Sequence, residues 1–161
     1  MVEAEKTARK HLKALGVTTP IRELAMSTLN EHTKPADVAA LLAPLLAGED
    51  VGLISEAGCP AVADPGAQLV ALAHERGIRV APLIGPSSIL LAVAASGLNG
   101  QSFAFHGYLP IDSVARTNKI KQIEQRIYSE HETQLFIETP YRNNKLAEEL
   151  VRTCRPSTKL C

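Results

Sequence analysis

Apolar positions along this chain fall into two alternating patterns, short continuous runs and longer stretches with helical spacing. The short runs are rich in apolar and β-branched residues, which is typical of buried strands, and they occupy residues 21–26, 51–54, 78–83, 102–106, 134–138 and 158–161. The longer stretches place apolar residues three and four positions apart, which predicts helices at residues 3–15, 36–47, 66–76, 89–96, 113–129 and 143–153. Because the two patterns alternate, the sequence predicts an α/β fold.

Strand, loop and helix follow one another in the same order at residues 51–76 and again at residues 78–96. Such units in series imply parallel strands and right-handed crossovers, which puts the loops after the strands on one edge of the sheet. We therefore expect a parallel-sheet first domain with helices on both faces. Because the composition becomes charged beyond this part, we expect a domain boundary near residues 107–114.

Composition excludes several classes of protein. The 161 residues are 45% hydrophobic, which supports a buried core and argues against wholesale disorder. Charge or proline interrupts every apolar run before the roughly 18 residues of a membrane span, and the first residues do not form a secretory signal. The three cysteines (Cys59, Cys154 and Cys161) are far apart and the five histidines are scattered, so we expect no disulfide framework, no metal site and a cytoplasmic location.

Charge is unevenly distributed, although the formal net charge is zero. Residues 1–112 contain 8 Lys and Arg against 11 Asp and Glu, whereas residues 113–161 contain 9 against 6. The excess of cations in the second part weakly favours an anionic partner there. It is much smaller than the basic face of a protein that nucleic acid holds by charge alone.

The loops after the two central strands carry glycine and proline where a ligand could approach the backbone. Gly58 and Pro60 flank Cys59 in the first loop. Glycine lets backbone groups come close to a ligand and proline fixes the turn, although a tight turn without a ligand has the same composition. In the second loop, Gly85-Pro86-Ser87-Ser88 starts a helix, where free N–H groups favour an anion; either serine could also act as the helix N-cap.

Carboxylates next to these strands are candidates for chemistry. Glu56 follows a strand directly and has no capping role, so we expect it to face the sheet edge and contact substrate or cofactor. Asp64 precedes Pro65, which predicts a cap for the next helix. Glu138 ends a later strand, where it could accept hydrogen bonds from a ligand or be an exposed strand-end charge.

Basic residues of the second part have two interpretations each. Arg142, together with Tyr141, could hold a substrate phosphate by a bidentate contact and offer a stacking face, or could be a solvated residue at a helix start. The helix at residues 113–129 is expected to be largely a solvated face, with Arg116, Lys119 and Lys121 as a weak anion-binding patch.

Four motifs in order make the sequence recognisable: GLISEAGCPAVADPG, RVAPLIGPSSILLAVAASGL, FAFHGYLP and FIETPYRN. Together they resemble the tetrapyrrole (corrin/porphyrin) methylase family of S-adenosylmethionine-dependent methyltransferases. The chain looks most like the branch that contains the small-subunit ribosomal RNA 2′-O-cytidine methyltransferase, which reads S-D-A-G-T-P followed by D-P-G. Here Glu56 stands for the family's Asp and Cys59 for its Thr, which indicates a side branch.

The resemblance implies two α/β domains with S-adenosylmethionine in the cleft between them, and a homodimer. In this chain it implies a first α/β domain at residues 1–106, a linker at 107–112 and the start of a second α/β domain at 113–161. The methyl acceptors that it implies include the 2′-hydroxyls of ribosomal RNA. A hydroxyl acceptor would gain from a base within hydrogen-bond reach, and Glu56 is the best candidate for this catalytic role. The resemblance places Glu138 beside the adenosine. The cofactor-binding residues that it implies are Ser55, Glu56, Ala57, Gly58, Cys59, Pro60, Gly85, Pro86, Ser87, Ser88, Tyr108, Ile137, Glu138 and Thr139.

Two departures from the family suggest a fragment of a protein of well over 200 residues. The family opens with a strand and a G-x-P-x-G-type loop, and its second domain has further strands; this chain has neither. We therefore expect the chain alone to methylate poorly or not at all. Two alternatives stay open: a non-catalytic adenosylmethionine-binding or interaction module, and an α/β domain that binds a phosphate ligand at residues 85–88.

Overall fold

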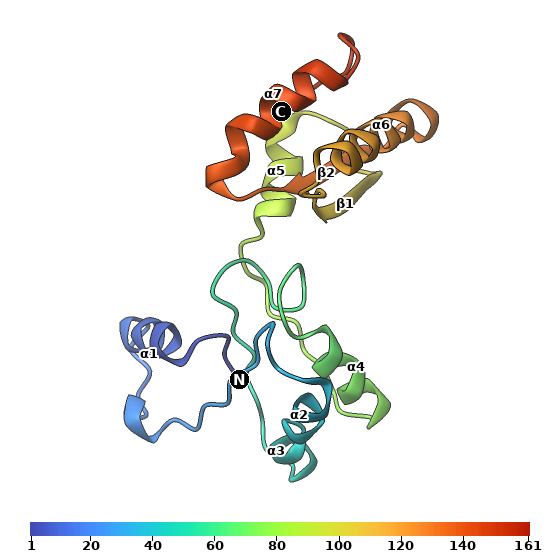
Figure 1. Ribbon diagram of the computed structural model, residues 1–161. Coiled ribbons are helices and arrows are strands. Elements are labelled where there is room, and N and C mark those ends of the chain that lie inside the picture. Colours follow the sequence, from blue (N-terminus) through green and yellow to red (C-terminus); the bar gives the residue numbers. More distant parts are fainter. The chain divides into compact units, whose positions relative to one another are not determined.

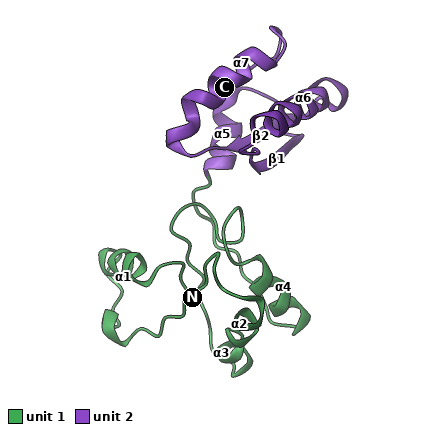
Figure 2. Cartoon of the chain, viewed as in Figure 1, with its two compact units in different colours: residues 1–87 green, residues 88–161 purple.

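Two parallel strands, β1 (Phe103–Tyr108) and β2 (Thr133–Ile137), form the sheet of this protein (Figure 1). Helix α6 (Ser113–Glu130) connects them, as the crossover between parallel strands requires. The computed structural model describes residues 1–161, and these divide into two compact units, residues 1–87 and residues 88–161 (Figure 2). The predicted α/β class is confirmed. The predicted domain boundaries stay a prediction; residues 107–112 cover the end of β1 and the turn into α6.

The unit of residues 88–161 is built around this sheet. Its other elements are α5 (Ser88–Ser96), the short 3-10 helix η2 (Pro140–Arg142) and α7 (Asn143–Thr153). Helices α6 and α7 pack together, and their buried apolar residues form one cluster with the residue that follows β1: Leu109, Ile120, Ile123 and Leu146. Ile120, at the centre of α6, is completely buried. The sheet edge is thus fixed to a hydrophobic core through both helices.

The unit of residues 1–87 has helices and single bridges. Its helices are α1 (Glu5–Ala14), η1 (Ile21–Glu23), α2 (Pro35–Ala40), α3 (Ala43–Leu46) and α4 (Ala67–Glu75). Val2 lies at its centre and makes parallel bridges to Thr28 and to Ile54. A core of apolar residues joins α2 and α4, and it consists of Leu29, Val38, Leu42, Leu69 and Ala73. This unit therefore obtains its order from side-chain packing more than from a hydrogen-bonded ladder.

Several strands predicted from apolar runs are not strands. Residues 51–54 and 78–83 are extended, but only Ile54 is bridged; residues 21–26 begin instead with η1, where the Glu23 N–H donates to the Pro20 carbonyl at 2.8 Å. Residues 158–161 form no strand either, because Thr158 is tied to α6 by its side chain. A strand exists only when a neighbouring strand accepts its backbone hydrogen bonds, and apolar content alone does not supply that neighbour.

Two helix predictions also need correction. The helix expected at residues 36–47 is broken into α2 and α3, because Pro44 has no N–H to donate to the preceding turn. Asp64 does not cap α4, whose N-cap is Gly66 and receives no side-chain hydrogen bond. In contrast, the helix predicted at residues 143–153 has those bounds in the structure. None of the helices combines the length and the apolar character that crossing a membrane needs.

Candidate functional site

The two glycine loops predicted to bind a cofactor meet within the first unit. The Cys59 thiol lies 3.9 Å from the Pro86 carbonyl oxygen, so the residue after Gly58 approaches the residue after Gly85. Gly58 is in the left-handed region with φ 72°, and a Cβ built on it would meet no atom within 4 Å. The loops therefore present exposed backbone next to open space, as a ligand-binding turn requires.

The segment after Gly58 has an unusual backbone. Ala61 and Ala63 both have positive φ, 67° and 58°, which is costly for residues that carry a Cβ. Gly66, at φ 134°, cannot carry a side chain without a clash, because its Cβ would lie 2.8 Å from Leu53 Cδ2. Close packing against the extended residues 51–54 thus forces the shape of this loop.

Glu56 and Asp64 sit in a locally acidic environment. The Glu56 side chain is exposed, and its backbone N–H donates to Glu3 Oε2 at 3.1 Å. Partial burial and the nearby negative charge of Glu3 raise the pKa of Asp64 above its ordinary value. No ion pair offsets the charge of Asp64. The Glu56 side chain is thus open to solvent, whereas Asp64 is half-buried in the loop.

The second group of predicted residues gathers at the carboxyl edge of the sheet in the other unit. The register pairs Tyr108, the last residue of β1, with Ile137, the last residue of β2. Glu138 and Thr139 follow at once, so four predicted residues share this edge. We call this set of residues the carboxyl edge. The side chain of Tyr108 is exposed there.

Glu138 is not the exposed strand-end charge that one interpretation of the sequence allowed, since its side chain is only 6% exposed. Its Oε1 atom lies 2.6 Å from Arg142 Nη2 and accepts the Thr139 N–H at 2.7 Å. Burial alone would raise the pKa of Glu138, but these hydrogen bonds and the Arg142 charge outweigh it and hold the pKa below the usual range. All of these contacts involve Oε1, which leaves Oε2 available to a ligand.

Arg142 is committed to the protein itself. Besides the ion pair with Glu138, its Nε donates to Thr139 Oγ1 at 3.1 Å and its backbone N–H donates to the Thr139 carbonyl at 2.9 Å. A guanidinium engaged in this way is poorly placed to clamp a substrate phosphate, which was one interpretation of the sequence. The i,i+4 spacing of Glu138 and Arg142 is the signal that could have revealed this pair.

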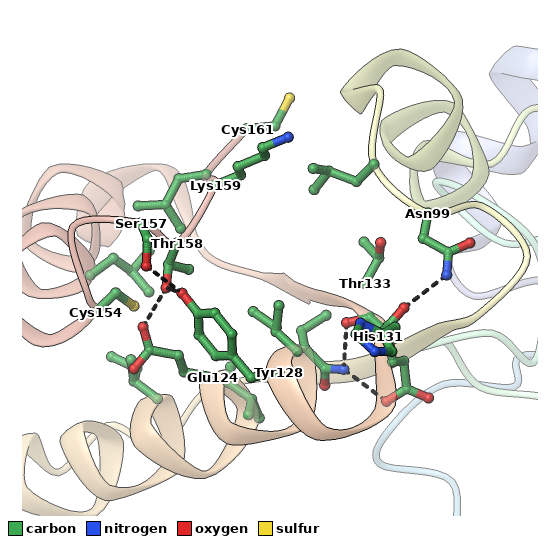
Figure 3. A pocket seen from close by; sticks show the side chains of 18 of the residues that line it. Asn99, Glu124, Tyr128, His131, Thr133, Cys154, Ser157, Thr158, Lys159 and Cys161 are labelled. Carbon is green, nitrogen blue, oxygen red and sulfur yellow. Dashed lines mark hydrogen bonds between the residues drawn. The ribbon is translucent and has the colours of Figure 1, made fainter.

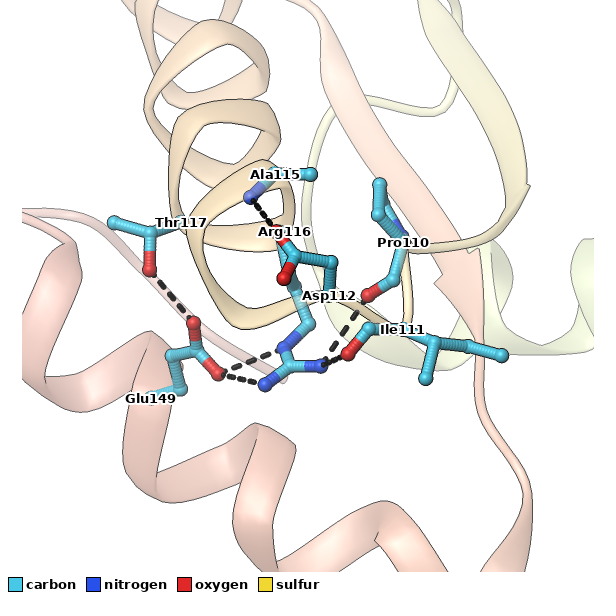
Figure 4. A network of polar contacts seen from close by, with 7 residues as sticks. All are labelled: Pro110, Ile111, Asp112, Ala115, Arg116, Thr117 and Glu149. Carbon is cyan, nitrogen blue, oxygen red and sulfur yellow. Dashed lines mark hydrogen bonds and ion pairs between the residues drawn. The ribbon is translucent and has the colours of Figure 1, made fainter.

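A buried ion pair joins α6 to α7 (Figure 4). It could not be predicted from the sequence. Arg116 of α6 and Glu149 of α7 are 7% and 3% exposed, and Nη2 lies 2.6 Å from Oε2. Arg116 Nη1 also donates to the Pro110 and Ile111 carbonyls, at 3.2 and 2.8 Å, just after Tyr108. Arg116 therefore does not belong to an anion-binding patch. It fixes the loop after β1 to the helix after β2.

The Thr117 hydroxyl completes this network by donating to Glu149 Oε1 at 2.8 Å. Burial raises the pKa of Glu149, but the hydrogen bonds from Thr117 and Arg116 and the charges of Arg116 and Arg152 outweigh burial, so the net pKa is lowered. The partners stand 33 residues apart in the sequence, and no local pattern links them.

The second unit also has a cavity that other residues line (Figure 3). It measures about 420 Å³, and its walls come from α6, from the first residues of β2 and from the segment after α7. Tyr128 holds that segment, because its hydroxyl lies 2.9 Å from Ser157 Oγ and 2.8 Å from Thr158 Oγ1, and Arg155 stacks on its ring at 4.6 Å. None of the predicted site residues lines this cavity. They form two separate groups, the glycine loops around Gly58 and Gly85 in the first unit and the carboxyl edge in the second.

Comparison with known proteins agrees with the family resemblance that the sequence motifs indicate. The chain is 38% identical over 114 residues to the ribosomal RNA small subunit methyltransferase I of Vibrio cholerae, covering 71% of this chain and 38% of that protein. It is 35% identical over 144 residues to the protein of that name from Xylella fastidiosa, covering 88% and 50%. For Mesorhizobium japonicum the identity is 40% over 121 residues, covering 75% and 39%.

The chain thus spans half or less of the length of these curated relatives. The family described as Tetrapyrrole (Corrin/Porphyrin) Methylases matches residues 2–160, almost the whole sequence, and the relatives match most of it. This chain belongs to the tetrapyrrole methylase family.

Proposed function

We propose that the protein to which this chain belongs is an S-adenosylmethionine-dependent methyltransferase that acts on ribosomal RNA of the small subunit. The observation that carries this proposal is the family match over residues 2–160, together with relatives that are named as methyltransferases of that RNA. A methyl group on a 2′-hydroxyl is the product that we favour. A homodimer in the cytoplasm is part of the same proposal.

The residues present fit the cofactor. The first unit offers exposed backbone at Gly58 and Gly85, with open space at both glycines and a thiol contact that joins the two loops. The second unit offers Glu138 Oε2, a carboxylate oxygen that could accept a hydrogen bond from a ribose hydroxyl or an adenine amine. Thr139 donates its backbone N–H to that carboxylate, and Ile137, which precedes Glu138, pairs with Tyr108 in the register of the sheet.

The bound cofactor supplies an activated methyl group on a sulfonium, so the protein chiefly has to orient the reactants and exclude water. The glycine loops would hold the cofactor through backbone groups, and Glu138 would orient its adenosine. Glu56, exposed and joined to Glu3 only through its backbone, would take the proton from an attacking hydroxyl. The proton would end on the Glu56 carboxylate, the C–O bond would form as the methyl–sulfur bond breaks, and the leaving group would be a neutral thioether.

Calorimetry with adenosylhomocysteine tests the cofactor part of the proposal, and incorporation of labelled methyl into unmodified small-subunit ribosomal RNA tests the activity. Both use the natural full-length protein, because residues 1–161 span half or less of the length of the curated relatives. Binding of adenosylhomocysteine without methyl transfer to any acceptor would favour a non-catalytic binding module. Binding of a sugar phosphate in place of adenosylhomocysteine would favour a phosphate-ligand domain that uses residues 85–88.

A further inference from the structure

Tyr141 lies two residues after Thr139, the last residue of the carboxyl edge, and its aromatic side chain is strongly exposed. Its side chain is 83% exposed, although it lies in the short helix η2 immediately after β2 and Glu138. A tyrosine has a large apolar ring, and leaving that ring in water forgoes the free energy of burial. The ring of Tyr141 contacts the neighbouring Arg142, whose guanidinium carbon lies 5.7 Å from the ring centre.

The turn that carries Tyr141 is held firmly from the inside. Arg142 binds Glu138 Oε1 at 2.6 Å and Thr139 Oγ1 at 3.1 Å, and Pro140 restricts the backbone at the start of η2. These contacts engage the charge of Arg142 within the protein, whereas the side chain of Tyr141 stays exposed. The hydrogen-bonded turn limits the backbone entropy that binding a ligand to the ring would cost, which favours a stacking surface.

Exposed polar residues continue from Tyr141 into the first turn of α7. Asn143, Asn144 and Lys145 are all exposed, and Lys145 is in no ion pair. This segment also belongs to the part of the chain in which Lys and Arg exceed Asp and Glu, 9 against 6 over residues 113–161. An exposed ring followed by an uncompensated cation matches single-stranded nucleic acid, whose bases stack on aromatic faces while phosphates meet lysine.

We infer that Tyr141 stacks on an unpaired base of the RNA substrate and that Lys145 contacts a neighbouring phosphate. The inference rests on the proposed function in taking RNA as the acceptor. Tyr141 and Lys145 act as binding residues that place the acceptor next to the carboxyl edge. The Glu138–Arg142 ion pair holds the turn on which Tyr141 lies. The backbone atoms of the RNA supply affinity, and the stacked base supplies position.

The test compares variants of the natural full-length protein in binding to unmodified small-subunit ribosomal RNA transcribed in vitro. Tyr141→Ala should weaken RNA binding roughly ten- to a hundred-fold, the usual effect of removing one stacking residue. Tyr141→Trp, which keeps an aromatic face, should retain the affinity. Lys145→Ala should weaken binding and reduce the slope of log affinity against log salt by about 0.7, the value for one phosphate contact on a single strand.

Val151→Ala is the matched control, because Val151 is also exposed, at 75%, and lies at the other end of α7. It should leave RNA binding unchanged. Adenosylhomocysteine affinity should be the same in all four variants, which also reports that they fold. Equal RNA affinity for Tyr141→Ala and the natural protein would overturn the inference. So would a change in oligomeric state without a change in RNA affinity, since that would make Tyr141 a contact between protein copies.

The inference and the proposed function can fail separately. If the natural protein methylates the RNA but Tyr141→Ala binds it equally well, the inference fails and the function stands. If Tyr141→Ala loses RNA affinity while the natural protein binds no adenosylhomocysteine, the inference stands and the methyltransferase proposal fails. If the natural protein does not bind the RNA, the inference and the RNA substrate are both wrong.

Discussion

The carboxylates of the two units are held in opposite ways. In residues 1–87, Asp64 is partly buried next to Glu3 and has no cation beside it. In residues 88–161, Glu138 and Glu149 are more deeply buried, and each has an arginine at 2.6 Å. The second unit therefore fixes its carboxyl edge by paired charges, whereas the loop at residues 58–66 of the first unit depends on backbone conformation and close packing. Substitutions should therefore act differently in the two units.

Breaking the Arg116–Glu149 pair should have the largest effect on stability. Arg116→Met leaves Glu149 buried without its cation, and the loss of one partner of a buried pair usually costs about 3–5 kcal/mol. Urea unfolding measures this loss. The matched control is Arg126→Met, because Arg126 pairs with Glu132 at the same 2.6 Å but is 46% exposed; its loss should cost less than about 1 kcal/mol. Equal losses in the two variants would contradict a special role for the buried pair.

In the first unit, Gly58→Val should abolish the binding of adenosylhomocysteine, at least about a hundred-fold. A β-branched residue is strained at φ 72°, and its side chain would enter the open space in front of the loop. Circular dichroism should stay unchanged, because no neighbouring atom lies within 4 Å of the new Cβ. Calorimetry checks the prediction, and unchanged affinity would remove this loop from the cofactor site.

In the second unit, Glu138→Ala tests the proposed role of the carboxyl edge in cofactor binding. Loss of a carboxylate that accepts a ribose or amine hydrogen bond should weaken cofactor binding by about 1.5–3 kcal/mol, or roughly ten- to a hundred-fold. Glu138→Gln keeps an acceptor and should lose less. Since Glu138 also braces Arg142, we expect Glu138→Ala to weaken RNA binding as well. Unchanged cofactor affinity in Glu138→Ala would show that Glu138 positions Arg142 but does not contact the cofactor.

The pH dependence of stability should differ in sign between the two units. The pKa of Glu149 is lowered in the folded state, so its stabilisation is complete above the ordinary Glu pKa of about 4.3 and is lost as the pH falls below it. The pKa of Asp64 is raised, so Asp64 destabilises at neutral pH, and this penalty disappears as the pH falls toward its unfolded pKa of about 3.9.

The smallest predicted effect follows from that difference. Asp64→Asn should stabilise the protein at pH 7 by less than about 1 kcal/mol, because solvent screens a partly buried carboxylate, and should have no effect near pH 3. Urea midpoints at the two pH values measure it. A gain that is equal at both pH values would show that packing, and not the charge, is responsible.

Local patterns were sufficient for the two strands of the sheet and for most of the helices, with the break between α2 and α3 as an exception. The bounds of α7 could be predicted from its apolar spacing, and β1 and β2 appear within two residues of the predicted runs. The same rule failed at residues 51–54 and 78–83, because whether an apolar run becomes a strand depends on a partner elsewhere in the chain. Sequence placed Glu138 at a strand end but put Tyr108 in the linker after residues 102–106, whereas β1 continues to Tyr108. The Arg116–Glu149 contact could not be predicted, because it needs the packing of α6 on α7.

Methyl transfer from S-adenosylmethionine to unmodified small-subunit ribosomal RNA is the most direct test of the account. The natural full-length protein and its Gly58→Val variant are compared at saturating RNA, with label counted in the RNA. We expect transfer by the natural protein and none above background by Gly58→Val. No transfer by the natural protein, or equal transfer by both proteins, would contradict the proposed site.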